Sequence, residues 1–326
     1  MKRGGEMMKD PDAGSKGGLP SALGNRECPG RGGVPSGSMP PSKKRPVSLA
    51  AALVALALFA GCDTPAPPPD AVIFGKTQVY LNGSRASVRT EETNLGNLTA
   101  DAYLWFARKK DPSTVISLRN SGGIRESIDS GEISQLDIEQ SLPFNNALVL
   151  VTVTAAQLEQ VLEHGVAAVA PDVTAGQFLQ VSGLRFEYDA SKPAQLFDLD
   201  GNLLTEGERI RQAVIVDGSG NVVDTLVSNG ALAGDPDRTF RMVTLDFVVA
   251  LGGDYFPFPL FELQNAARYN LVPLDTTPNN QGFNDEGREH RAFADYLAAT
   301  WPASGPGYAE ADTPKDADTR IKSVGP

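Results

Sequence analysis

Histidine and cysteine are scarce in this chain of 326 residues, which contains two of each. Neither His164 nor His290 belongs to an HExxH zinc motif, and the sequence has no GxxxxGK phosphate loop and no GxSxG nucleophile motif. The common signatures of zinc proteases, P-loop NTPases and serine hydrolases are therefore missing. His164 lies in an apolar-periodic segment and is predicted to be structural, whereas His290 is expected at the surface.

Long hydrophobic runs are also rare, and the main one is too short for a membrane span. It extends from Val47 to Ala60, follows basic residues 43–45 and ends in small residues before Cys62. About fourteen apolar residues fall short of the roughly 20 that cross a bilayer, so the run is typical of a signal peptide. Its ending, LFAGC, resembles a bacterial lipobox, which implies cleavage before Cys62 and lipid on its thiol. The alternative is an ordinary cleavage site followed by a free thiol.

These signals divide the chain into segments that are expected to be removed, to act as a tether or to fold. The first 38 residues are rich in Gly, Pro and Ser without a hydrophobic period, and Met39 opens a conventional signal sequence. We expect a protein anchored by lipid in a bacterial cell envelope, on the periplasmic or extracellular face. The predicted segments are a mis-assigned, disordered extension (1–38), a signal peptide (39–61), a Pro-rich tether (62–72), a folded domain (73–302) and a tail (303–326).

Basic residues are in short supply as well. The whole chain has 29 Lys and Arg against 40 Asp and Glu, and residues 1–61 hold nine of the basic and four of the acidic residues. The exported part therefore keeps 20 basic and 36 acidic residues. Such an excess of negative charge repels nucleic acid, which is not expected as a partner. Because Cys28 is removed with residues 1–61, the folded domain has no cysteine left for a disulfide and must be stabilised by its core.

The exported part does contain alternating strand and helix patterns. Apolar runs predict strands, and apolar residues at helical spacing predict helices, with Thr154 as the cap of one of them. After residue 178, short strands alternate with turn sequences such as VDGSGN. The pattern predicts an α+β fold with mixed, largely antiparallel sheets. Strands are expected within 71–81, 113–120, 146–153 and 238–250, and helices within 94–110, 155–170 and 287–300.

Four polar segments carry the residue types of an anion and nucleoside site. They are RTEETNLGNL (89–98), NSGGIR (120–125), LPFNN (142–146) and LGGDYF (251–256). Arginine binds phosphate through two parallel hydrogen bonds, and glycines let backbone N–H groups approach an anion. An aromatic face stacks on a base, and a carboxylate accepts hydrogen bonds from ribose hydroxyls.

The order and spacing of these segments, with FLQVSGLRFEYDASKP (178–193) between them, resemble the C-terminal, substrate-binding domain of the 5'-nucleotidase and UDP-sugar hydrolase family. The resemblance covers roughly residues 73–300 and implies a layered α/β/β/α arrangement. By matching motif positions, it implies a phosphate side made by Arg89, Asn120 and Arg125, a base side made by Phe144 and Asn146, and a ribose contact at Asp254.

Two positions depart from the family pattern. The second stacking Phe of the family falls at Val248, and Phe247, one residue earlier, is expected on the opposite face of the predicted strand. Tyr255 stands where the family usually has Gly. A bulge could return Phe247 to the pocket face, or Tyr255 could supply the missing ring or narrow the pocket. Otherwise only one aromatic ring stacks on the base.

The resemblance also implies a two-metal phosphoesterase centre in a separate N-terminal domain, built from DxH, GNH[DE] and GHxH segments. This sequence contains none of them. We therefore expect no catalytic residue, metal ligand or cofactor in this chain, and divalent metals only through a partner. The leading hypothesis is a nucleotide- or nucleoside-binding lipoprotein of nucleotide catabolism that acts with a separate metallophosphoesterase chain. The alternatives are a scavenging or sensing receptor without hydrolysis, and a degenerate envelope interaction module.

Overall fold

A computed structural model describes residues 71–198, 202–250, 252–277, 282–312 and 319–325. The signal peptide, the lipidation of Cys62 and most of the tether lie outside these residues and remain predictions. Within the described residues, no helix has the length and apolar character needed to cross a membrane.

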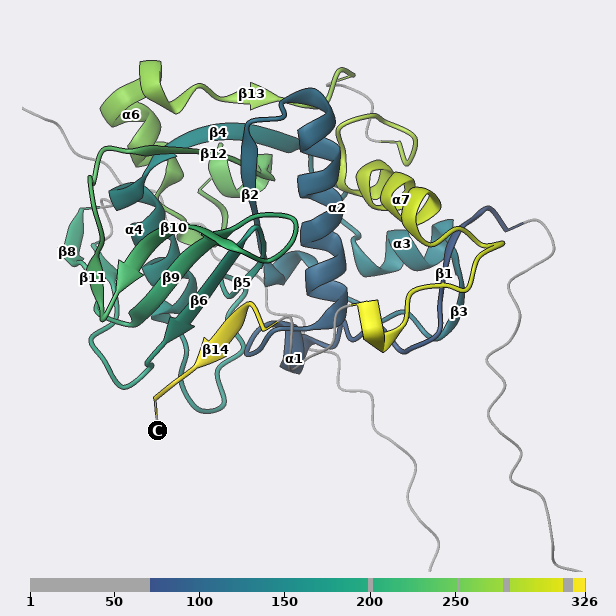
Figure 1. The fold of residues 1–326 in the computed structure, drawn as a ribbon, viewed down its shortest axis with the longest axis horizontal. Helices are drawn as coiled ribbons and strands as arrows, with labels where there is room; N and C mark the ends of the chain where they lie inside the picture. Colours follow the sequence, from purple (N-terminus) through teal and green to yellow (C-terminus); the bar gives the residue numbers. More distant parts are fainter. Residues whose placement is uncertain (1–70, 199–201, 251, 278–281, 313–318, 326) are drawn as a thin grey trace, which may run out of the picture. The chain divides into compact units, whose positions relative to one another are not determined.

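Two five-stranded sheets organise the described part of the chain (Figure 1). Most neighbouring strands are antiparallel; β2 with β12 and β6 with β14 are the parallel pairs. The α+β fold with largely antiparallel sheets is confirmed. The first sheet has the order β13 (Val272–Pro273), β4 (Leu148–Thr154), β12 (Thr239–Leu245), β2 (Thr114–Asn120) and β5 (Leu179–Ser182). The second has the order β11 (Ala231–Leu232), β10 (Val222–Ser228), β9 (Ile210–Val216), β6 (Leu184–Tyr188) and β14 (Ile321–Ser323).

Smaller elements complete the described fold. Two strand pairs stand apart from the large sheets: β1 (Ile73–Thr77) with β3 (Gly131–Ser134), and β7 (Leu196–Phe197) with β8 (Leu203–Thr205). The helices are α1 (Arg85–Val88), α2 (Asn94–Lys110), α3 (Gln135–Ser141), α4 (Ala155–Ala167), α5 (Asp246–Val249), α6 (Phe258–Tyr269) and α7 (Glu289–Thr300). Single 3-10 turns are η1 (Ser121–Gly123), η2 (Gly253–Tyr255) and η3 (Glu310–Asp312).

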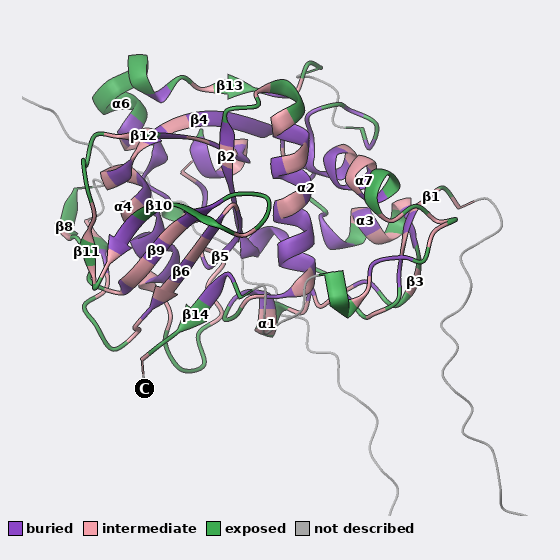
Figure 2. Cartoon of the chain, in the orientation of Figure 1, coloured by how far each residue is buried: buried purple, intermediate pink, exposed green. Residues whose placement is uncertain are grey.

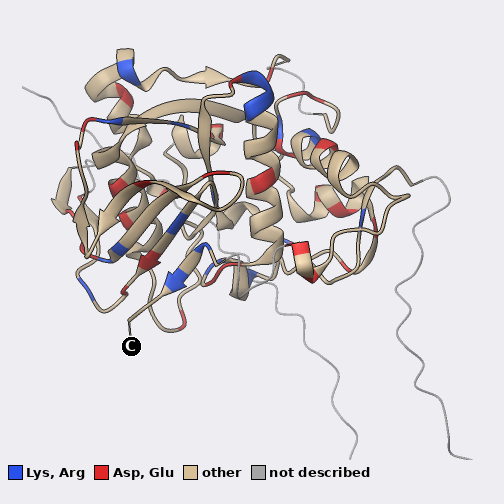
Figure 3. Cartoon of the chain, in the orientation of Figure 1, with Lys and Arg blue, Asp and Glu red and all other residues tan. Residues whose placement is uncertain are grey.

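The long helix α2 is held by local chemistry at both ends and by packing along its length. The Thr93 hydroxyl accepts a hydrogen bond from the Gly96 N–H at its start, and basic residues 108–110 occupy its last turn, where they offset the helix dipole (Figure 3). Its buried face packs on β2 and β5, and α7 lies beside it (Figures 1 and 2). This packing holds β2, the strand that leads into the NSGGIR loop, against a long helix.

Helix α4 touches both large sheets and begins as predicted. The Thr154 hydroxyl accepts from the Gln157 N–H, and the Gln157 side chain accepts from the Thr154 N–H, which is a complete capping box. The helix contacts β4 and β5 of the first sheet and β9, β10 and β11 of the second. It therefore joins the two sheets through one buried apolar face.

The strand predicted for residues 238–250 is wrong at its C-terminal end. Strand β12 ends at Leu245, and the next four residues form α5. The cause is Asp246, whose Oδ1 accepts hydrogen bonds from the backbone N–H groups of Ala147 and Phe247 and turns the chain. The alternation argument for Phe247 and Val248 does not apply, because these residues are helical and not extended.

The surface position predicted for His290 is also wrong. Its side chain is buried in the first turn of α7, and its Nε2 donates a hydrogen bond to the Leu142 carbonyl at 2.6 Å. The ring packs near Phe283, with centroids 5.5 Å apart. The charged neighbours in the sequence gave no sign that α7 buries this side of the helix against the chain near α3.

Candidate functional site

A pocket of about 260 Å³ lies where the segments predicted from the motifs come together. It is bounded by α1, the loop after β2, the turn before β4 and the η2 turn. Of the seven binding residues predicted from the sequence, six line it, and Tyr255 does not. The six are Arg89, Asn120, Arg125, Phe144, Asn146 and Asp254.

Three guanidinium groups surround one side of this pocket. Arg85 begins α1 and Arg89 caps its end, so both project from a single helical turn, and Arg125 faces the same pocket from the loop after β2. Burial and the positive charges of Arg85 and Arg125 lower the pKa of Arg89, against a smaller opposing effect of Asp254. Arg89 is buried, and its Nε has no hydrogen-bond partner among the described residues. Crowded cations with an unpaired donor favour a bound anion.

The two glycines of the NSGGIR loop make room for neighbouring side chains. A Cβ on Gly123 would lie 2.4 Å from Nη2 of Arg119, and one on Gly122 would lie 3.2 Å from Oδ2 of Asp254. The Gly122 N–H donates to the carbonyl of Gly176, a further pocket residue, at 2.9 Å. This N–H is therefore engaged within the protein, which differs from the expected backbone cradle for an anion.

Asp254 is held at the pocket by contacts from two other segments. The Nδ2 of Asn120, at the end of β2, donates a hydrogen bond to its Oδ2. The Nε2 of His164 in α4 donates to the Asp254 carbonyl at 2.8 Å, and the His164 ring packs edge-on against Phe256 at 4.7 Å. Burial lowers the pKa of His164 and favours its neutral form. His164 therefore has a structural role, as predicted, because it holds the η2 turn in place.

Two phenylalanines provide the aromatic part of the pocket. Phe144 has a side chain that is 53% exposed, and the guanidinium carbon of Arg125 lies 4.9 Å from the centre of its ring. Phe247 lines the pocket from α5, whereas Val248 is fully buried in the core. The Phe247 ring lies flat on the η2 turn, since a Cβ on Gly253 would lie 2.3–2.5 Å from its atoms. Phe247 is therefore a second aromatic residue at the pocket, and it reaches the pocket from a helix and not through a β-bulge.

Tyr255 lies outside the pocket lining and does not narrow it. Its side chain is 87% exposed, and its φ of 63° is in the left-handed region that favours glycine. Asp254 also has a positive φ, of 54°, so two consecutive non-glycine residues adopt this conformation. The sequence allowed a stacking ring at this position, but the backbone turns that ring toward solvent.

Replacing Tyr255 by glycine is expected to stabilise the fold by about 1 kcal/mol, because it removes left-handed strain and costs little packing. The change is measured as a shift in the midpoint of urea unfolding. Tyr255→Ala is the matched control, since alanine keeps the Cβ and its strain and is expected to remain near wild type. Equal stabilisation by both substitutions would show that loss of the exposed ring, and not relief of backbone strain, is responsible.

Arg85 and Gly176 are pocket residues that the motifs did not single out. Arg85 carries a sequence signal, because it lies four residues before Arg89 and so on the same face of a helical turn. Gly176 has no such sequence signal, because it reaches the loop after β2 only through the packing of segments that are distant in the sequence.

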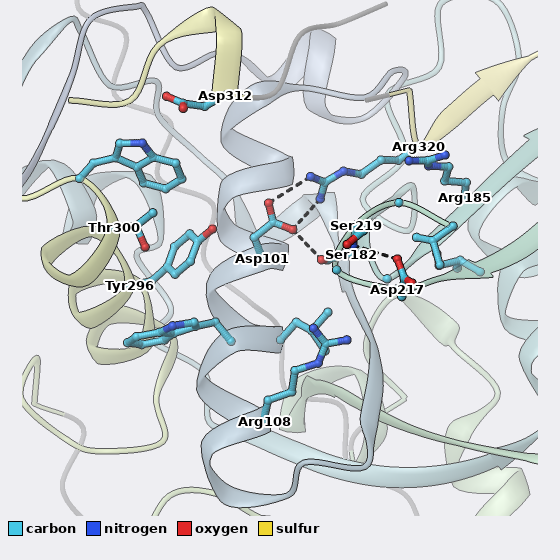
Figure 4. A pocket seen from close by; sticks show the side chains of 18 residues that line it. Asp101, Arg108, Ser182, Arg185, Asp217, Ser219, Tyr296, Thr300, Asp312 and Arg320 are labelled. Atoms are coloured by element: carbon cyan, nitrogen blue, oxygen red, sulfur yellow. Dashed lines mark hydrogen bonds and ion pairs between the residues drawn. The ribbon is translucent and has the colours of Figure 1, made fainter. Parts of the chain in front are cut away.

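A larger pocket of about 570 Å³ lies between α2, α7 and the turns that follow β5 and β9 (Figure 4). Its central carboxylate, Asp101, accepts two hydrogen bonds from Arg320, at 2.7 and 3.0 Å, and a third from Ser182. Two turns further along the same helix, the Nε of Arg108 donates to the Thr114 carbonyl at 3.0 Å (Figure 4). The larger pocket is lined by three arginines and three aspartates, whereas the smaller one is lined by three arginines and one aspartate, so the smaller pocket is the stronger candidate for an anionic ligand.

Metal-ligating side chains do not gather in the part of the chain that the structure describes. No group of three or more His, Cys, Asp or Glu side chains in that part is arranged to hold a metal ion.

Comparison with known proteins relates this pocket to a family. Residues 73–261 match the family model described as 5'-nucleotidase, C-terminal domain. The chain is 34% identical over 185 residues to the trifunctional nucleotide phosphoesterase protein YfkN of Bacillus subtilis, covering 56% of this chain and 11% of that protein. It is 36% identical over 207 residues to a snake venom 5'-nucleotidase of Crotalus adamanteus, covering 61% of this chain and 32% of that protein.

Solved structures agree with the sequence comparison. A 5'-nucleotidase precursor from Thermus thermophilus is 31% identical with a TM-score of 0.55, covering 78% of this chain and 39% of that one. The NAD nucleotidase of Haemophilus influenzae, at 16% identity and a TM-score of 0.54, shows the shared fold; 78% of this chain and 38% of that one are covered. The chain spans from about a tenth to two fifths of the length of these proteins. It belongs to the 5'-nucleotidase C-terminal domain family.

Proposed function

We propose that this chain binds a nucleotide or nucleoside in the 260 Å³ pocket. The phosphate lies against Arg89 and Arg125, assisted by Arg85, and the base lies against Phe144 and Phe247. The observation that carries the proposal is the combination of three guanidinium groups with an exposed aromatic ring around a single pocket.

The charge balance of the pocket supports an anionic ligand. Three arginines face it together with one carboxylate, that of Asp254, in a chain whose net charge is −11. A local positive site on an acidic protein attracts small anions without collecting nucleic acid. Asp254, held by Asn120, leaves its other oxygen to accept hydrogen bonds from ribose hydroxyls.

The size of the pocket favours a small nucleotide. A volume of about 260 Å³ is just below the usual range of small-molecule sites, which begins at roughly 300 Å³. A mononucleotide or nucleoside fits this scale better than a dinucleotide does. The arginines and the aromatic rings line one pocket, as a ligand with an anionic end and a flat ring requires.

We further propose that the chain takes part in nucleotide catabolism beside a separate metallophosphoesterase chain. The support is the family membership together with the absence of DxH, GNH[DE] and GHxH segments from the sequence. The lipobox-like ending before Cys62 supports a lipid-anchored position in the bacterial envelope. In this arrangement the chain contributes affinity for the nucleotide, and the partner contributes the metals and the hydrolysis.

Isothermal titration calorimetry with AMP, adenosine and UDP-glucose tests the binding proposal. AMP is expected to bind more tightly than adenosine, because only AMP engages the arginines. No detectable binding of any of the three at millimolar concentration would overturn the proposal. Release of phosphate from AMP by the purified chain with Mn²⁺ or Zn²⁺ would contradict a role limited to binding.

A further inference from the structure

A buried carboxylate from the C-terminal part of the chain reaches the wall of the pocket. Glu289, the first residue of α7, has a side chain that is 0% exposed. Its Oε1 accepts two hydrogen bonds from Asn146, one from the backbone N–H at 2.9 Å and one from Nδ2 at 3.1 Å. Helix α7 lies beyond residues 73–261, the segment that the family model matches. Glu289 therefore acts on the pocket from outside the family-matched segment.

The other oxygen of Glu289 is anchored from α2 and β2. Its Oε2 accepts a hydrogen bond from the Tyr103 hydroxyl at 2.8 Å and lies 3.7 Å from Nη1 of Arg119. The same Nη1 donates to the Tyr103 hydroxyl at 2.7 Å. Burial raises the pKa of Tyr103 well above its ordinary value, which keeps its hydroxyl protonated as a donor. With both oxygens engaged, Glu289 has no freedom to turn away from Asn146.

This arrangement determines which way the Asn146 amide points. A carboxylate only accepts hydrogen bonds, so the atom of the amide that faces Glu289 must be the nitrogen. A flipped amide would place Oδ1 about 3.1 Å from Oε1, two acceptors facing each other at a partly buried position. Asn146 lines the pocket, and none of the described residues donates to its Oδ1. The amide therefore offers the pocket an acceptor.

The neighbouring ring shows which part of a ligand meets this acceptor. Asn146 follows Phe144 by two residues on the turn before β4, and both line the pocket. Arg89 and Arg125 account for the phosphate of the proposed ligand. A flat base on Phe144 would place its polar edge beside Asn146.

We propose that Glu289 is a positioning residue that sets the hydrogen-bond polarity of the base end of the pocket. By holding the Oδ1 of Asn146 free, it favours bases that present an exocyclic amino group there, as adenine and cytosine do, over bases without a donor at that point. The inference rests on the proposed function, since it requires a nucleotide in this pocket.

The test compares AMP with purine riboside 5'-monophosphate, which has hydrogen in place of the 6-amino group and is otherwise the same molecule. In the wild-type chain, AMP is expected to bind about fivefold more tightly, as one neutral hydrogen bond provides. Asn146→Ala is expected to bring the ratio of the two dissociation constants close to one. Glu289→Asp keeps the charge beside Arg119 but withdraws the carboxylate from Asn146, and it is expected to lower the ratio in the same way.

The ratio of the two dissociation constants distinguishes a positioning role of Glu289 from a purely structural one. A purely structural role of Glu289 would weaken both nucleotides equally and leave the ratio at its wild-type value, and that result would overturn the inference. If Glu289→Asp does not fold, the charge-balanced double substitution Arg119→Met with Glu289→Met tests the same point, because it also frees the Asn146 amide. A ratio of one in a wild-type chain that binds both nucleotides would overturn this inference alone. No binding of either nucleotide would overturn the proposed function.

Discussion

Replacing Arg125 by alanine is expected to weaken AMP binding by roughly 10- to 100-fold, the effect of losing one or two hydrogen bonds to a charged phosphate. Arg125 reaches the pocket from the loop after β2, and its charge already lowers the pKa of Arg89. Adenosine has no phosphate, so its affinity is expected to change by less than about threefold, through the lost contact with Phe144. Calorimetric titration of both ligands into both proteins measures the difference.

Arg185→Ala is the matched control for this substitution. Arg185 lines the larger pocket between α2 and α7 and does not line the smaller one, so its loss is expected to leave both affinities unchanged. Equal losses of AMP and adenosine affinity in Arg125→Ala would show that Arg125 supports the pocket in general and does not contact phosphate. An unchanged AMP affinity would remove Arg125 from the site.

Replacing Arg119 by methionine is expected to reduce the free energy of unfolding by about 3–5 kcal/mol, the usual cost of leaving a buried charge without its partner. The Arg119 and Glu289 side chains are both 0% exposed. Without Arg119, the Glu289 carboxylate keeps the Tyr103 hydroxyl and the two Asn146 donors but loses the cation nearby. Urea unfolding followed by circular dichroism measures the change.

An exposed ion pair provides the comparison for this prediction. Arg268 and Asp237 form a salt bridge at 3.4 Å with side chains that are 52% and 73% exposed. Arg268→Met is expected to cost less than about 1 kcal/mol, because water solvates the remaining charge. The double substitution Arg119→Met with Glu289→Met is expected to be more stable than Arg119→Met alone. A cost for Arg119→Met as small as that of Arg268→Met would show that burial does not govern this pair.

Much of the site follows from short stretches of sequence. Asn120 and Arg125 flank a pair of glycines directly after a buried strand, and Arg89 follows a short helical turn, so each reaches the pocket through its own local structure. The apolar periods also predicted the position of α2 and the capped start of α4. These features depend on residues that are close in the chain, for which side-chain spacing and capping chemistry are sufficient.

Other parts of the site depend on contacts between distant segments. Phe247 was expected on a strand, but the hydrogen bond of Asp246 to Ala147, almost a hundred residues away, turns that segment into α5. Tyr255 was a candidate for the second ring, and a left-handed backbone directs it to solvent instead. Such outcomes are decided by packing across the fold, and no local pattern reports them.

The sequence by itself determined the classes of residue at the pocket, the alternation of strands and helices, and the family motifs, because all of these are written in short, ordered segments. Only the tertiary structure decided how they meet. It placed Phe247 on the η2 turn, engaged the Gly122 N–H within the protein and joined Glu289 to Asn146 across 143 positions of chain. The physical reason is that a buried carboxylate is stable only when hydrogen-bond donors surround it. Folding can bring these donors from segments that are far apart in the sequence.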